Sequence, residues 1–334
     1  MVKLRIISDI HFDSGLNGLA KNTKKTYNHS PFGSYFGKSL KKEKDCVTLI
    51  AGDLSSSINN TQEFLEYFFP NQPVFFVMGN HDGIYQVTDK TIYELKEEWT
   101  NTFSKNHLFW HCLENDWMWI PGTNEQVAII GSTFYTNYEY TTFTLDTYND
   151  YKKRWHTLLQ LYGLCSKDDN YKPIKKLTKC KIISENLLLA SERLNDFQWG
   201  KETKYTKLTP ETYLKLHNIA KEQILRCYNE ILAINENAKV ILMTHHCLSP
   251  KCIDEKYINS LSNASYVSDL EKWLCKEMPN LRLIISGHVH CRKDFIFGKD
   301  KKRYVINACG YIPRNEPFNK PKFNPNFIID TEEL

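Results

Sequence analysis

The chain has 334 residues, of which 41% are hydrophobic and 25% charged, so it can bury a sizeable core as one large domain or two small ones. Its formal net charge of +4 argues against strong binding of long double-stranded nucleic acid. The first residues lack the apolar core of a signal peptide, and no apolar run approaches the ~20 residues that span a bilayer. We therefore expect a cytoplasmic protein without a membrane partner, although a specialised secretion route would leave no such signal.

Short apolar runs recur along the chain between longer polar or amphipathic segments. These runs predict strands at residues 3–8, 46–51, 73–78, 117–120, 127–131, 239–243, 281–286, 294–297, 303–307 and 327–329. Two neighbouring pairs of runs enclose short turns and predict hairpins, at residues 117–131 and 294–307. The first two strands are separated by a polar stretch that predicts a long loop, with Gly15, Gly18, Pro31, Gly33 and Gly37.

Amphipathic spacing predicts helices at residues 61–69, near 184–197 and from 210 into 235. Thr209 is placed as the N-cap of the last helix, with Pro210 at its first position, where the missing N–H of proline costs nothing. The segment 138–208 is polar and rich in Lys, Asp, Asn and Tyr. We predict that it forms a largely helical insertion.

Five of the predicted strands are followed at once by residues that can bind metal or carry out chemistry. The motifs are Asp9-Ile10-His11, Gly52-Asp53, Gly79-Asn80-His81-Asp82, Thr244-His245-His246 and Gly287-His288-Val289-His290. Each motif is common alone, but all five in order, each directly after an apolar run, form a specific signal. Strand carboxyl ends line one edge of a sheet in layered α/β folds, so these residues are expected to meet at one site.

In this order the motifs resemble those of the calcineurin-like metallophosphoesterases, which are D-x-H, GD, GNH followed by D or E, H, and GHxH. The resemblance spans residues 9–290 and implies an α/β (α+β) fold, a four-layer αββα sandwich with two mixed β-sheets. We expect a single domain over residues 1–334, with the insertion at about 138–208 as a cap over the site. The resemblance also implies two metal ions, the first held by Asp9, His11, Asp53 and His290. The second would be held by Asp53, Asn80, His245 and His288.

The residue types suit that chemistry. Imidazole and carboxylate ligands favour two divalent transition-metal ions, manganese first, with iron, zinc or nickel as alternatives, over an all-oxygen magnesium or calcium site. The carboxylate of Asp53 has two oxygens and can bridge, whereas Asn80 offers a neutral oxygen that leaves the site electropositive. His288 and His290 would face opposite ways on a strand, so their segment is expected to be a loop.

Further residues are candidates for catalysis and substrate binding. His81 is the candidate general acid beside the leaving group, and Asp82 is the candidate residue to orient it. His246 follows a ligand and would contact the substrate or hydrogen-bond a ligand. The candidate substrate contacts are Asn80, His81, His246, Asn195 and Asp196. The last two lie in the insertion near Arg193, and the alternative is that the insertion is a solvated helical segment without a role in selection.

Several positions depart from the protein Ser/Thr phosphatase branch of this family. Phe12 stands where that branch has glycine, and Asp82 stands where it has glutamate. The residues that follow Asp53 lack the second Asp and the phosphate-binding Arg of that branch. The tail at residues 307–329 instead resembles a bacterial and phage-type branch.

The expected function is hydrolysis of phosphate esters by attack of a hydroxide that bridges two metal ions, with a slight preference for diesters. The expected substrate is a small phosphate ester or a short single-stranded molecule. The enzymatic alternatives are a phosphomonoesterase, a protein phosphatase or a nuclease. A scaffold that keeps the fold without catalysis is the alternative of another class.

Overall fold

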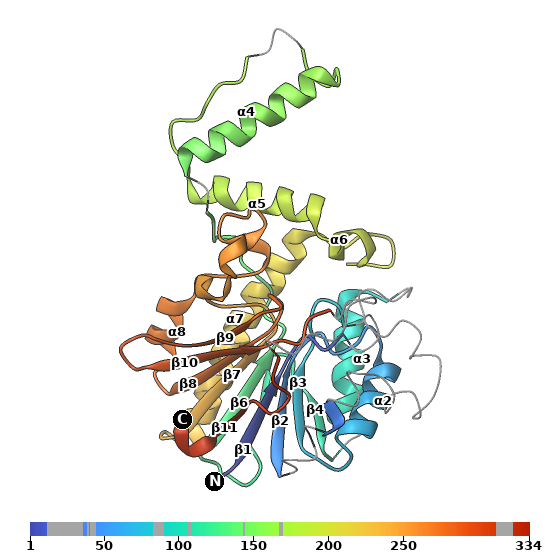
Figure 1. Ribbon diagram of the computed structural model, residues 1–334, viewed down its shortest axis with the longest axis vertical. Coiled ribbons are helices and arrows are strands. Elements are labelled where there is room, and N and C mark those ends of the chain that lie inside the picture. The colour runs from blue at the N-terminus through green and yellow to red at the C-terminus, as the bar shows by residue number, and fades with distance from the viewer. Residues whose placement is uncertain are drawn as a thin grey trace.

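The computed structural model describes residues 1–11, 36–38, 40, 45–82, 90–105, 108–142, 144–166, 170–311 and 323–334. Two β-sheets pack face to face, and helices cover their outer faces (Figure 1). This is a four-layer αββα sandwich, so the predicted fold class is confirmed.

The first sheet has parallel central strands and one antiparallel edge. Its order is β11 (Ile328–Asp330), β1 (Lys3–Ile7), β2 (Cys46–Ala51), β3 (Val74–Val77) and β4 (Trp110–Cys112). Strands β2 and β3 are buried along their whole length, which explains why they read as continuous apolar runs. Helices α2 (Ile58–Phe68) and α3 (Ile92–Lys105) cover the outer face through Phe64 and Trp99.

The second sheet follows the same plan, with antiparallel strands at both edges. Its order is β5 (Asp116–Trp119), β6 (Val127–Ser132), β7 (Lys239–Thr244), β8 (Leu281–Ser286), β10 (Lys302–Asn307) and β9 (Arg292–Phe297). Helices α7 (Pro210–Ile234) and α8 (Glu271–Glu277) cover its outer face. Both predicted hairpins are confirmed, as β5–β6 and β9–β10.

One hydrophobic core lies between the sheets, where Leu49 and Phe75 of the first sheet and Ile241 and Leu283 of the second are fully or almost fully buried. Removing such side chains from water is the dominant favourable term in folding. The packing of the two sheets therefore sets the relative position of all strand ends, including the ends of β1, β2, β3, β7 and β8 that carry the motifs.

Helix α7 begins and ends where the sequence predicts. The Thr209 side chain accepts a hydrogen bond from the Thr212 N–H, and Pro210 occupies the first turn. Helix α2 begins earlier than expected, because the Ser57 side chain caps it by accepting from the Asn60 N–H. Helices α3 and α8 and strand β4 were not among the predicted elements. The predicted loop residues Gly15, Gly18, Pro31 and Gly33 lie outside the described residues, whereas Gly37 is helical, within residues 36–38, so the loop prediction was wrong there.

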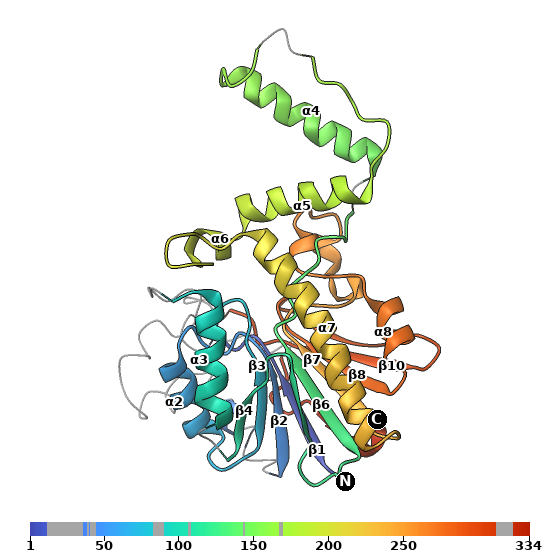
Figure 2. The same cartoon turned by 180° about the vertical axis from the view of Figure 1, so that it is seen from behind.

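The insertion contains α4 (Leu145–Leu161), α5 (Lys179–Arg193) and α6 (Asp196–Trp199). Seen from behind, α5 and α6 lie over the end of α7, and α4 projects farther from the sheets (Figure 2). The helix predicted near 184–197 is thus two helices, because Leu194 between them is extended. Short 3-10 helices occur at Pro250–Cys252, Glu255–Tyr257, Asn263–Ser265 and Thr331–Glu333. Among the described residues, no helix combines the length and apolarity needed to cross a membrane.

Candidate metal centre

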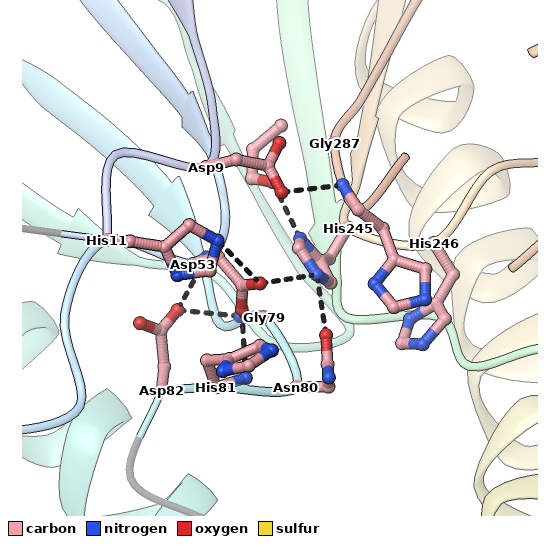
Figure 3. A network of polar contacts seen from close by, with 12 residues as sticks. Asp9, His11, Asp53, Gly79, Asn80, His81, Asp82, His245, His246 and Gly287 are labelled. Atoms are coloured by element: carbon pink, nitrogen blue, oxygen red, sulfur yellow. Dashed lines mark hydrogen bonds and ion pairs between the residues drawn. The ribbon is translucent and has the colours of Figure 1, made fainter. Parts of the chain in front are cut away.

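The five motif segments meet at the carboxyl ends of strands from both sheets (Figure 3). Asp9 follows β1, Asp53 follows β2, Asn80 follows β3, His245 follows β7 and His288 follows β8. The structure therefore brings together residues from positions 9 to 290, as the sequence analysis expected.

The first group of converging side chains consists of Asp9, His11, Asp53 and His290, whose possible ligand atoms all lie within 4.8 Å of one another. The Nε2 atoms of His11 and His290 are 2.9 Å apart, and Asp9 Oδ1 lies 3.4 Å from His290 Nε2. Two ligand atoms at about 2.1 Å from one ion lie about 3.0–3.4 Å apart for angles between 90° and 109°. These distances therefore fit donors that share one ion.

The second group consists of Asp53, His245 and His288, again within 4.8 Å of one another. Asn80 joins it, since its Oδ1 lies 3.0 Å from His245 Nε2. The Nδ1 of His245 lies 2.9 Å from the Ala51 carbonyl oxygen, which can only accept, so this nitrogen carries the proton and Nε2 is left to bind a ligand. Asp53 belongs to both groups, which is the arrangement that a bridging carboxylate needs.

Three buried atoms in these groups have no hydrogen-bond partner within the described part of the chain. They are Asp9 Oδ2, Asp53 Oδ2 and His288 Nε2. Leaving a polar atom buried and unsatisfied costs about 1–3 kcal/mol, so native structures rarely concentrate such atoms. A bound cation would satisfy all three, and the residues present therefore fit a metal centre.

Backbone conformation is also unusual here. Five of the converging residues have positive φ, which non-glycine residues seldom adopt: Asp9 at 51°, His11 at 43°, Asp53 at 53°, His288 at 69° and His290 at 46°. Such conformations cluster at functional sites, where surrounding contacts maintain them. Residues 287–290 lie outside any strand, so the predicted loop is confirmed, and both of its histidines can turn toward the site.

Gly79 allows the third motif to approach Asp53. A Cβ atom at this position would lie 2.0 Å from Asp53 Oδ1 and 2.5 Å from the Asp53 backbone nitrogen. We expect Gly79→Ala to lower the free energy of unfolding by about 1–3 kcal/mol through overpacking, and to reduce metal content by displacing the carboxylate. Thermal unfolding and metal analysis of the dialysed protein measure both effects. Gly37→Ala is the control, because among the described residues its Cβ would lie near Phe68 Cε1 alone, at an ordinary contact distance of 3.7 Å. A Gly79→Ala protein with normal stability would contradict the expectation.

Burial and neighbouring charges shift the pKa values of the candidate metal ligands in opposite directions. Burial lowers the pKa of His11 to about 4, although Asp53 and Asp9 oppose it. Burial also acts to lower the pKa of His245, but the negative charge of Asp53, whose Oδ2 lies 3.4 Å from Nε2, outweighs it and raises the pKa to about 9. Burial acts to raise the pKa of Asp53, yet the attraction of His245 and His81 keeps it well below its usual range. A cation bound at His245 would therefore release a proton.

The two predicted catalytic residues, His81 and Asp82, have different surroundings. His81 lines a cavity next to the groups, and its backbone N–H donates to Asp53 Oδ1 at 2.9 Å. Asp82 accepts hydrogen bonds from the backbone N–H groups of Asp53 and Gly79 at 2.9 and 2.7 Å (Figure 3). It also accepts from the Ser55 N–H at 3.0 Å. Burial, then the charge of Asp53, raises the pKa of Asp82 to about 7. These bonds link Asp82 to the loop after β2, whereas the sequence analysis placed it as a residue that orients His81.

His246 is buried, and its Nδ1 lies 3.3 Å from the Thr133 carbonyl oxygen. Its ring is centred 4.3 Å from that of His288. Burial, then the neighbouring His245, lowers its pKa well below the usual range, so the ring is neutral. The ring also lines the cavity, where substrate contact was expected, whereas its hydrogen bond goes to Thr133 and not to a candidate metal ligand.

The cavity has a volume of about 490 Å³ and extends from the two groups toward the insertion. Arg193 and Asn195 line it and are exposed. Asp196 also borders the cavity, but it is buried and both of its carboxylate oxygens accept from the side-chain amide of Asn80.

Two tyrosines at the site were not among the predicted site residues. Tyr311 stacks on His11 with ring centroids 4.3 Å apart, and its hydroxyl lies 3.2 Å from His81 Nε2. Tyr266 stacks on His288 with centroids 4.7 Å apart. The only signal for Tyr311 is its place four residues after the end of β10, and nothing local marks Tyr266.

Comparison with known proteins agrees with this geometry. A model of the calcineurin-like phosphoesterase family matches residues 2–292. No curated protein sequence matches the chain. The solved structure of phosphopantetheinyl hydrolase (PptH) from Mycobacterium tuberculosis has 15% sequence identity and a TM-score of 0.58, over 96% of this chain and 93% of that one. A putative 5'-nucleotidase from Staphylococcus aureus, in complex with alpha-ketoglutarate, has 12% identity and a TM-score of 0.40, over 91% of this chain and 48% of that one.

The likeness to the hydrolase shows a shared fold. The family model covers all five motifs, and Asp196 belongs to none of them. The matched region includes both converging groups, from Asp9 to His290. This chain therefore belongs to the calcineurin-like phosphoesterase family.

Proposed function

We propose that the chain hydrolyses phosphate esters and that its two converging groups hold two divalent transition-metal ions, with Mn²⁺ as the first choice. The observation that carries this proposal is the position of Asp53 Oδ2, 3.6 Å from His11 Nε2 and 3.4 Å from His245 Nε2, between the two groups. When bound, the ions would supply positive charge for the phosphate and a water of lowered pKa. The mixed nitrogen and oxygen donors favour transition metals over magnesium or calcium.

The chain's own contribution to the leaving group comes from His81. Its imidazole lines the cavity and is paired with the Tyr311 hydroxyl. Burial, then the charges of Asp53 and Asp9, raises the pKa of Tyr311, so the hydroxyl keeps its proton and can hold the imidazole in place. We propose that His81 gives a proton to the departing oxygen.

The cavity supports a small substrate. Its volume of about 490 Å³ is within the ~300–1,000 Å³ that is usual for small-molecule sites. Tyr257, Ser260, Ser262 and Asn263 also line the cavity, and their hydroxyl and amide groups can bind a polar group of the ester. Within this class we propose a slight preference for diesters, or for a short single-stranded molecule.

A substrate panel tests this function. Protein stripped of metal and then loaded with Mn²⁺ should hydrolyse at least one of a monoester, a diester, cyclic nucleotides, single-stranded DNA and a phosphopeptide, with diesters faster than monoesters. A phosphopantetheinyl ester belongs in the panel because the solved structure with the same fold is described as a phosphopantetheinyl hydrolase.

The stripped protein without Mn²⁺ is the control and should be inactive. A protein that binds no metal after incubation with Mn²⁺ would contradict the proposal directly. A protein that binds two ions but cleaves no ester would instead support the scaffold alternative.

A further inference from the structure

A carboxylate of the insertion lies directly behind one of the converging residues. Asp196 is the first residue of α6 and is only 3% exposed. The Asn80 Nδ2 group donates to both of its oxygens, each at 3.1 Å, and the Tyr213 hydroxyl of α7 donates to Oδ2 at 3.0 Å. Asp196 therefore connects the insertion and α7 to the third motif.

The direction of these bonds determines how the Asn80 amide is turned. An ionised carboxylate can only accept hydrogen bonds, so the NH₂ group of the amide must face Asp196. The amide oxygen must then face the opposite way, where it lies 3.0 Å from His245 Nε2. If the amide were reversed, its oxygen would meet the carboxylate oxygens and its NH₂ group would face the metal centre. A reversed amide cannot act as a metal ligand.

We infer that Asp196 is a positioning residue, which keeps the oxygen of Asn80 directed at the second metal group while Tyr213 holds Asp196 in place. This inference rests on the proposed function and replaces the expectation that Asp196 contacts substrate. It predicts a selective effect, because only the second group, with Asn80, Asp53, His245 and His288, depends on this amide. The group with His11 and His290 does not.

The surroundings of Asp196 support a fixed orientation. Burial, then the charge of Asp196, holds the pKa of Tyr213 well above its usual value, so its hydroxyl remains a donor. Tyr213 is itself buried and stacks on Tyr135 with ring centroids 3.9 Å apart. Packing against Tyr135 therefore fixes the position of the Tyr213 hydroxyl, which donates to the Asp196 carboxylate.

The test is a Mn²⁺ titration of the stripped full-length protein, read by calorimetry and by electron paramagnetic resonance. Asp196→Asn keeps the side-chain volume but places an NH₂ group where an acceptor was. We expect one Mn²⁺ at the wild-type affinity and the second weakened by ~10–100-fold, the usual effect of losing a partner of a metal ligand. At one equivalent, the spectrum should be that of an isolated Mn²⁺ ion.

The exchanged pair Asn80→Asp with Asp196→Asn gives the sharpest readout. The new amide at 196 can donate to the new carboxylate at 80, whose other oxygen then faces the metal whichever way the group is turned. The exchange should recover most of the second affinity that Asp196→Asn alone loses, because the two side chains are in contact and their substitutions are therefore coupled. Tyr213→Phe keeps the charge of Asp196 and should weaken the second ion alone, by less than Asp196→Asn does.

Tyr148→Phe and Glu185→Gln are matched controls. They alter a similar tyrosine–carboxylate hydrogen bond, of 2.9 Å, within the insertion and outside the metal centre. Both controls should leave the two Mn²⁺ affinities unchanged. If either one weakens the second ion as Asp196→Asn does, the effect is a general loosening of the insertion and the inference is wrong.

The remaining outcomes separate this inference from the proposed function. A wild-type protein that binds fewer than two Mn²⁺ ions contradicts the proposed function itself. A wild type with two ions, together with an Asp196→Asn protein of unchanged affinities, overturns the inference alone. Equal weakening of both ions would show an effect of charge at long range and would also overturn it. If Asp196→Asn does not fold, by circular dichroism, Tyr213→Phe decides on the same criterion.

Discussion

Replacement of Asp53 by asparagine should remove both metal ions and slow ester hydrolysis by ~10³-fold or more, because several kcal/mol of transition-state stabilisation depend on them. The Asp53 carboxylate lies between His11 and His245, and it is the one residue shared by the two converging groups. Asparagine has the same shape but carries no charge, so its amide oxygen is a much poorer ligand for two cations. Metal analysis after dialysis against Mn²⁺, together with kcat on the best panel substrate, measures the loss.

Asp116→Asn is the matched control for this change, since Asp116 is exposed at the first residue of β5. It should keep both ions and full activity. The circular dichroism spectrum of Asp53→Asn should match that of the wild type, because the substitution keeps the volume of a buried side chain. If Asp53→Asn retained two ions at wild-type occupancy, the bridging role would be wrong.

Truncation of His81 to alanine should keep both metal ions and slow turnover by ~10²–10⁴-fold, the usual contribution of a general acid. His81 belongs to neither converging group, and its bond to Asp53 uses the backbone N–H, which alanine retains. The imidazole instead lines the cavity beside the Tyr311 hydroxyl. The measurements are kcat and metal content on the same preparation.

The leaving group distinguishes a general acid from a residue that only binds phosphate. An ester of p-nitrophenol needs little protonation as it departs, so the defect of His81→Ala should shrink on that substrate and remain large on an alkyl ester. Tyr311→Phe keeps the ring stacked on His11 but removes the hydroxyl, and it should show a smaller defect of the same kind. A His81→Ala protein with equal defects on both esters would contradict the role as acid.

Local sequence information was sufficient wherever a segment is buried on both sides or carries its own cap. Strands β2 and β8 occupy the predicted residues, since a strand packed on both faces is mostly apolar and reads as a nearly continuous hydrophobic run. Helix α7 has the predicted start, because the Thr209 cap and Pro210 act within one turn. Strand β4 was missed, because its three residues are too few to show a period.

The roles of individual side chains were less predictable. Asp82 was expected to orient its neighbour His81, yet it accepts from the backbone of Gly79, Asp53 and Ser55. Which donors surround a buried carboxylate depends on how the loops after β2 and β3 fold against each other. Adjacent positions in a sequence do not carry that information.

The sequence by itself determined the fold class and the set of residues that converge, because strand ends in a layered sheet meet at one edge and each motif follows its strand directly. Only the tertiary structure decided what stands behind and beside those residues. Asp196 reaches Asn80 across 116 positions, and Tyr311 reaches His81 across 230. Such contacts depend on how the insertion and the tail pack against the sheets. No periodicity or residue spacing in a single sequence indicates that packing.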